Sequence, residues 1–131
     1  MQIHQSAEDY LETILMLNQR MGRVRSIDVV NELGYTKASV SIAMKKLREN
    51  GYIAVDGEGN LTLLEPGREI AERIYSRHRL LTHFFVQLGV DEQTAAEDAC
   101  KAEHILSEQT LEKIREYALL HDAESTLKKE D

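Results

Sequence analysis

Three side chains in the C-terminal half of the chain have the types and spacing of metal ligands. Cys100, Glu103 and His104 occupy positions i, i+3 and i+4, which share one face of a helix. A soft thiolate, a carboxylate and an imidazole together suit a transition metal, and two or three further ligands would complete the coordination. The segment therefore predicts half of a metal site.

Further candidate ligands stand on two other predicted helices. Asp9 and Glu12 are spaced i, i+3 near the N-terminus, and His78 belongs to a long helical pattern. Three helices that present ligands inward would form a site of the kind found in helical bundles. Ordinary explanations also exist, with Asp9 as a capping residue and Glu12 as a solvated charge. Cys100 could be a small buried hydrophobe, and the two histidines could be hydrogen-bonded core residues.

Hydrophobic periodicity predicts a mainly α-helical chain with one β-hairpin. Helices are expected over residues 7–19, 26–33 and 37–50, the third capped by Thr36, and then over 66–88, 92–106 and 108–120. The polar tail after residue 120 is expected to fray. Two short β-prone runs, 52–55 and 61–64, flank a glycine-rich turn that is typical of a hairpin.

The order of the first elements is typical of an N-terminal winged helix-turn-helix over residues 1–65, although a three-helix domain with an incidental hairpin has the same order. The second helix of such a pair enters the major groove, where its start faces base edges while basic side chains contact phosphates. Residues 66–131 are expected to form a helical metal-binding and dimerisation domain. The predicted DNA-binding residues are Arg23, Arg25, Thr36, Lys37, Ala38, Ser39, Ile42, Lys45 and Lys46.

Charge is distributed unevenly along the chain, whose formal net charge is -7. Between Arg20 and Arg48 there are seven basic and two acidic side chains, whereas residues 65–131 carry nine basic and fifteen acidic ones. A basic N-terminal region joined to an acidic half fits a phosphate-binding head on a body with another task. An ordinary solvated charge pattern is the other interpretation.

Other classes of protein find little support in the sequence. It contains no G-x-S-x-G, glycine-rich phosphate loop, H-E-x-x-H or C-x-x-C motif, so we expect neither an enzyme nor a small-molecule substrate. No apolar run is long enough to span a membrane and the N-terminus lacks the features of a secretion signal, which predicts a cytoplasmic protein. The C-terminal helices are too few to bury their apolar faces alone, which predicts a homodimer.

Over almost its whole length the chain resembles the metal-dependent repressors of the diphtheria toxin repressor and manganese transport regulator type. The segment SIDVVNELGYTKASVSIAMKKLRENGYI resembles the family's helix-turn-helix, and EDACKAEHILSE resembles its metal-binding helix. The resemblance implies a homodimeric, metal-dependent repressor of metal-homeostasis genes that binds double-stranded operator DNA. The SH3-like domain of the iron-sensing members has no counterpart, so the architecture resembles the shorter manganese-sensing branch.

The resemblance also implies a set of metal ligands. Five positions match ligands of the manganese-sensing branch: Asp9, Glu12, His78, Glu103 and His104. Cys100 departs from that branch, which has a bridging carboxylate there, and is similar to the iron-sensing branch, which has a cysteine. Because thiolate favours softer metals and the carboxylates suit Mn(II), we expect Mn(II) or Fe(II), with Zn(II) or Co(II) binding in vitro.

Two alternatives to a metal-dependent repressor remain open at the level of sequence. One is a metal-independent winged-helix regulator in which Cys100, beside His104, senses oxidants. DNA binding that does not respond to chelators would favour it. The other is a structural or metal-storage protein, and the basic stretch from Arg20 to Arg48 argues against that.

Overall fold

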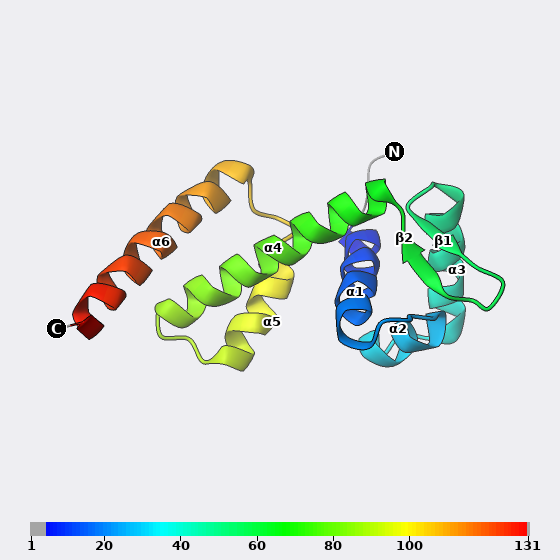
Figure 1. The fold of residues 1–131 in the computed structure, drawn as a ribbon, viewed down its shortest axis with the longest axis horizontal. Helices are drawn as coiled ribbons and strands as arrows, with labels where there is room; N and C mark the ends of the chain where they lie inside the picture. The colour runs from blue at the N-terminus through cyan, green and yellow to red at the C-terminus, as the bar shows by residue number, and fades with distance from the viewer. Residues whose placement is uncertain (1–4, 131) are drawn as a thin grey trace. The chain divides into compact units, whose positions relative to one another are not determined.

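The computed structural model describes residues 5–130, and describes side chains over residues 5–123. The chain forms two compact units, one ending at Arg73 and the other beginning at Ile74, so the boundary falls within a helix. Figure 1 labels the helices and strands. The elements are α1 (Gln5–Met21), α2 (Ser26–Leu33), α3 (Lys37–Glu49), β1 (Ile53–Val55), β2 (Leu61–Leu63), α4 (Glu65–Gln87), α5 (Glu92–Ala102) and α6 (Glu108–Glu130). This confirms the predicted mainly α-helical fold with one hairpin. Within the described range, no helix has the length and apolarity needed to cross a membrane.

The first unit is built around α1, which contacts α2, α3 and β2. Leu11 and Ile14 of α1 are fully buried, as their i, i+3 spacing requires for one helix face. From α3, the buried residues Val40, Met44 and Leu47 repeat at i, i+4 and i+7. The core therefore fixes which side of α3 faces inward and leaves the opposite side exposed.

The turn between α2 and α3 has the chemistry of a helix-turn-helix. Gly34 adopts a φ of 71°, a conformation that favours glycine, and its N–H donates to Val30 O at 2.8 Å to close α2. Thr36 then caps α3, because its hydroxyl oxygen accepts from Ser39 N at 3.1 Å. The predicted cap is confirmed.

The hairpin after α3 forms the wing. β1 and β2 pair antiparallel in the register Ile53↔Leu63, Ala54↔Thr62 and Val55↔Leu61. In the turn, Asp56 Oδ1 accepts from the backbone N–H groups of Glu58 and Asn60, both at 2.9 Å. Hydrogen bonds from the Asn60 side chain and backbone stabilise the ionised form and so lower the pKa of the Asp56 carboxyl. Asp56 thus stabilises the turn of the wing through its hydrogen bonds.

The second unit contains the C-terminal part of α4 together with α5 and α6. Leu81, Ala99 and Leu111, one from each helix, form its buried centre. Around them pack the partly buried apolar residues Leu80, Phe85, Ala102, Leu106 and Ile114. Asp91 caps α5 by accepting from Thr94 N at 3.1 Å, and Ser107 caps α6 by accepting from Thr110 N at 3.2 Å. The three helices are therefore locked by one small apolar cluster.

Two predicted helix boundaries are wrong. The helix expected over 92–106 ends at Ala102. Glu103 N still donates to Ala99 O at 2.9 Å, but Ile105 N donates to Ala102 O at 3.1 Å, a tighter turn that ends the helix. The last helix, expected to fray after residue 120, continues to Glu130. No glycine or proline interrupts residues 121–130, and loss of apolar periodicity alone does not end a helix.

Gly67 in the first turns of α4 provides a test of the packing in the first unit. A Cβ at Gly67 would lie 2.2 Å from the backbone oxygen of Tyr52 and 3.3 Å from Leu11 Cδ2. We predict that Gly67→Ala lowers the free energy of unfolding by about 2 kcal/mol, despite the better helix propensity of alanine. Urea unfolding measures this. The matched control is Gly57→Ala, because a Cβ there meets nothing within 4 Å. Equal stability of the two variants would contradict the close approach of α4 to Tyr52.

Candidate metal centre

The second unit contains a buried carboxylate that lies between two imidazoles. Glu103 is 0% exposed, and its Oε2 lies 2.9 Å from Nδ1 of His78 on α4. Its Oε1 lies 3.4 Å from Nε2 of His104, whose side chain is 2% exposed. Oε1 is itself buried and accepts no hydrogen bond within the described part of the chain. The structure thus brings together three of the predicted ligands.

Cys100 completes this cluster from the last turn of α5. A Cys100 Sγ and a Glu103 carboxylate oxygen lie within 4.8 Å of each other. The thiol is exposed, which contradicts the interpretation of Cys100 as a small buried hydrophobe. The predicted helical face is realised only in part, because Glu103 and His104 follow the end of α5. Glu103 keeps a helical backbone conformation, with φ -59° and ψ -23°, so the i, i+3 juxtaposition with Cys100 survives.

Arg77 positions the turn that bears Glu103 and His104, and sequence reasoning missed it. Its Nη1 donates to Glu103 O at 3.2 Å, and its Nη2 forms an ion pair with Glu108 at the start of α6. The Arg77 side chain is only 15% exposed. A basic residue on a long amphipathic helix ordinarily indicates a solvated charge, so no pattern in the sequence distinguishes this arginine from its neighbours. A hydroxyl likewise steadies His78, because Thr82 donates to its backbone oxygen at 2.8 Å.

These residues fit a divalent transition metal. A carboxylate removed from water is costly unless a charge or several hydrogen bonds compensate it, and Glu103 Oε1 accepts none from the side chains described over residues 5–123. Two imidazole nitrogens, a carboxylate oxygen and a thiolate form a mixed donor set of the kind that Fe(II), Co(II), Zn(II) and Mn(II) accept. The surrounding hydrogen bonds orient the donors, as outer-shell partners do at metal sites.

The two predicted ligands of the first helix belong to the other compact unit. Asp9 and Glu12 lie one turn apart on α1. Glu12 is 6% exposed, which contradicts its interpretation as a solvated charge. Asp9 is the fifth residue of α1, beyond the first turn where capping carboxylates act, so that alternative is also wrong. Tyr10, which lies between them in the sequence, is buried. Its burial is the main cause that raises the pKa of the Tyr10 hydroxyl, and the nearby charges of Tyr35 and Asp9 raise it further.

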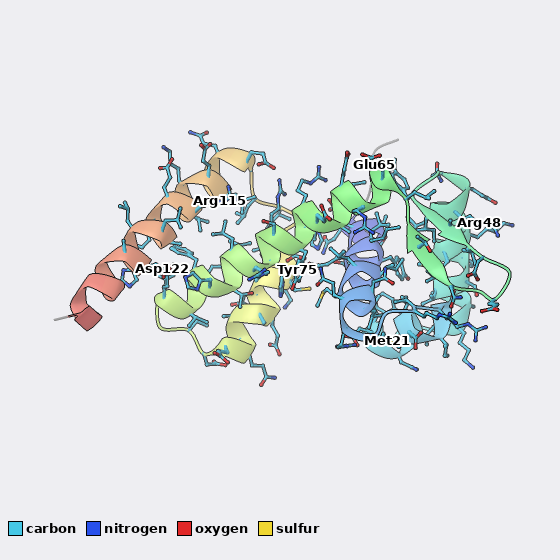
Figure 2. The ribbon with its side chains drawn as sticks, in the orientation of Figure 1. Met21, Arg48, Glu65, Tyr75, Arg115 and Asp122 are labelled. Atoms are coloured by element: carbon cyan, nitrogen blue, oxygen red, sulfur yellow. The ribbon has the colours of Figure 1, made fainter. Side chains whose placement is uncertain are left out.

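The predicted DNA-binding residues lie on the surface of the first unit. All of them are exposed: Arg23, Arg25, Thr36, Lys37, Ala38, Ser39, Ile42, Lys45 and Lys46. Arg23 lies 4.0 Å from Glu58 of the wing. The Arg25 guanidinium packs over Gly59, where an added Cβ would come within 3.4 Å of it. The side chains of α3, with Arg48 near its end, can be followed in Figure 2.

Arg77 provides a test of how the centre is positioned. We predict that Arg77→Ala lowers metal affinity about tenfold, because the Glu103 carbonyl loses its anchor while every proposed donor remains. Competition against a fluorescent chelator measures the affinity, and circular dichroism of the metal-free protein checks the fold. Arg79→Ala is the matched control, since Arg79 is exposed and lies over the Tyr75 ring, 5.8 Å from its centroid. Equal affinities for the two variants would exclude the positioning role.

Comparison with known proteins connects both units to one family. Residues 2–61 match the family described as "Iron dependent repressor, N-terminal DNA binding domain", and residues 64–120 match "Iron dependent repressor, metal binding and dimerisation domain". An uncharacterised HTH-type transcriptional regulator of Methanocaldococcus jannaschii is 37% identical over 113 residues, covering 85% of this chain and 90% of the relative. The HTH-type transcriptional regulator MntR of Bacillus subtilis is 31% identical over 125 residues, covering 95% and 88%.

A similar fold occurs in solved structures. The structure titled "Manganese-dependent transcriptional repressor complex with manganese" superposes with a TM-score of 0.78 at 28% identity. The match covers 86% of this chain and 52% of that one, so the chain spans about half the length of that structure. The winged helix-turn-helix, the cluster of His78, His104 and Cys100 around the buried Glu103, and these matches together assign the chain to the iron-dependent repressor family of metal-dependent, DNA-binding transcriptional regulators.

Proposed function

We propose that the chain represses metal-homeostasis genes by binding double-stranded operator DNA in response to Mn(II) or Fe(II) in the cytoplasm. The observation that carries the proposal is the Glu103 carboxylate, which is buried beside His78 and His104 in the unit that matches the family's metal-binding domain. The other unit supplies a winged helix-turn-helix with a basic, exposed helix. Membership of a metal-dependent family does not favour the metal-independent alternative with a redox-sensing cysteine.

The proposed ligand set combines residues from both units: Asp9, Glu12, His78, Cys100, Glu103 and His104. Support comes from their chemistry, from the cluster within the second unit and from the burial of Glu12. A bound divalent cation supplies positive charge that neutralises the carboxylates. The relatives with solved structures include one whose title names manganese, which supports Mn(II), whereas Cys100 adds a donor that softer metals prefer. Zn(II) and Co(II) are then expected to bind in vitro.

The proposed response depends on α1. This helix carries Asp9 and Glu12, and its neighbouring residue Tyr10 contacts Tyr35 of the helix-turn-helix edge to face, with ring centroids 5.9 Å apart. Ligands shared between the two units would restrict how the DNA-binding units of a dimer are arranged. The affinity for DNA then rises with the fraction of dimers in the competent arrangement.

The second unit exposes the apolar surface that dimerisation requires. Leu119 and Leu120 of α6 and Leu88 after α4 are exposed large hydrophobics. A groove of about 400 Å³ lined by Phe84, Ile114 and Tyr117 is also largely apolar. Such a surface on a small unit marks an interface, and the matching family domain is described as a dimerisation domain. The proposed homodimer would cover it.

The metal response is tested by removing one ligand from each unit. We predict that His104→Ala and Asp9→Ala give folded dimers that lose metal-stimulated DNA binding, because each removes a proposed donor. Fluorescence anisotropy with Mn(II), anaerobic Fe(II) or chelator measures binding, and sedimentation measures dimerisation. His121→Ala is the matched control, since His121 is exposed and stacks on Tyr117. Unchanged metal stimulation in either ligand variant would remove that residue from the site.

The choice of metal is tested at Cys100. We predict that Cys100→Glu shifts the response toward Mn(II) relative to Fe(II) or Co(II), because a hard oxygen donor replaces a soft sulfur donor. The measurement compares the metal concentrations that half-saturate DNA binding. Cys100→Ala should weaken the response to every metal. A fully responsive Cys100→Ala variant, together with an unchanged metal ranking in Cys100→Glu, would show that the thiol is not a ligand.

A further inference from the structure

The centre of the exposed face of α3 is apolar. Val40, Met44 and Leu47 hold one side of the helix in the core. At about 100° per residue, Ala38 and Ile42, which are one turn apart, lie on the opposite side. Both are exposed, and 58% of Ile42 is accessible to solvent. The two residues that project farthest from the core in the first half of α3 therefore offer no hydrogen-bonding group.

The surroundings of Ile42 distinguish it from an ordinary exposed hydrophobe. Lys45 and Lys46 follow one turn later, and both are exposed. Ile42 and Lys46 also line an apolar groove of about 300 Å³ between α1 and α3, together with Ser39. A large aliphatic side chain flanked by cations suits a surface that places an apolar group between anionic edges. The major groove of DNA does so at thymine, whose C5-methyl group lies between the two phosphate backbones.

Two hydroxyl groups near the start of α3 are partly engaged with each other. The Thr36 hydroxyl donates to Ser39 Oγ at 2.8 Å and accepts from Ser39 N. Lys37 is the cation at the start of the helix. Among the groups that base pairs present in the major groove, the C5-methyl of thymine is the apolar one, and aliphatic side chains contact it.

We propose that Ile42 is a specificity-determining residue that contacts the C5-methyl group of a thymine in each operator half-site. The proposal rests on the proposed DNA-binding function and adds the chemical group that α3 recognises. Burial of one methyl against Ile42 predicts an affinity difference of about three- to tenfold between thymine and a base lacking the methyl. Lys45 and Lys46 would contact the flanking phosphates without regard to sequence.

The experiment uses the full chain loaded with Mn(II) and a duplex that it selects from a random pool. Each thymine is replaced in turn by deoxyuridine, which removes only the C5-methyl, and dissociation constants are measured by fluorescence anisotropy. The unmodified chain should lose about three- to tenfold in affinity at one thymine per half-site. For Ile42→Ala this particular loss should disappear, while Ile42→Val should retain part of it. Circular dichroism checks that these exposed substitutions leave the fold intact.

Lys46→Ala is the matched control on the same helix. It should weaken binding to all duplexes alike and reduce the salt dependence, yet preserve the deoxyuridine effect. The same deoxyuridine profile for Ile42→Ala and the unmodified chain would overturn the proposal while leaving the proposed function intact. Failure of the metal-loaded chain to select any duplex would instead overturn the proposed function, and this inference with it.

Discussion

The buried carboxylate of Glu103 is the constraint on which the second unit depends. A carboxylate without solvent exposure is costly unless a charge or several hydrogen bonds compensate it. Here His78 and His104 approach its two oxygens, yet Oε1 accepts no hydrogen bond within the described residues, so the site suits a cation. That arrangement requires α5 to stop at Ala102 so that the chain can turn, and Arg77 to hold the carbonyl of the turning residue. The apolar cluster of Leu81, Ala99 and Leu111 fixes the helices that carry these groups. The packing of this unit and the position of its buried carboxylate therefore depend on each other.

In the first unit α1 has two roles. One face supplies core residues such as Leu11 and Ile14, while the same helix carries Asp9 and Glu12. Tyr10, placed between these acids, is buried against Tyr35, the residue that precedes the cap of α3. A displacement of α1 would therefore act both on proposed metal ligands and on the turn that orients the DNA-binding helix. No separate linking element is needed.

Much of this fold follows from local sequence patterns, whereas the centre depends on contacts between distant residues. Apolar spacing and caps such as Thr36 predict the helices and the hairpin because those signals act over a few residues. The spacing of Cys100, Glu103 and His104 predicts their proximity for the same reason. The approach of His78 to Glu103 depends on how α4 packs against α5, so the sequence marks His78 only as a candidate donor on another helix and does not fix the contact. Neither the burial of Glu12 nor the positioning role of Arg77 can be predicted from nearby residues, because glutamate and arginine on helices are usually exposed to solvent.

Charge explains why specificity is expected to reside in α3 rather than in the wing. The wing turn carries Asp56 and Glu58, and DNA phosphates repel both. Asp56 is committed to the turn by its hydrogen bonds, and Glu58 lies 4.0 Å from Arg23, so part of the basic charge near the wing is offset. Arg25 packs over Gly59. The cations of α3 have no such acidic partner among the described ion pairs. Close approach to DNA is therefore favoured along α3, where the apolar side chain of Ile42 would meet the bases.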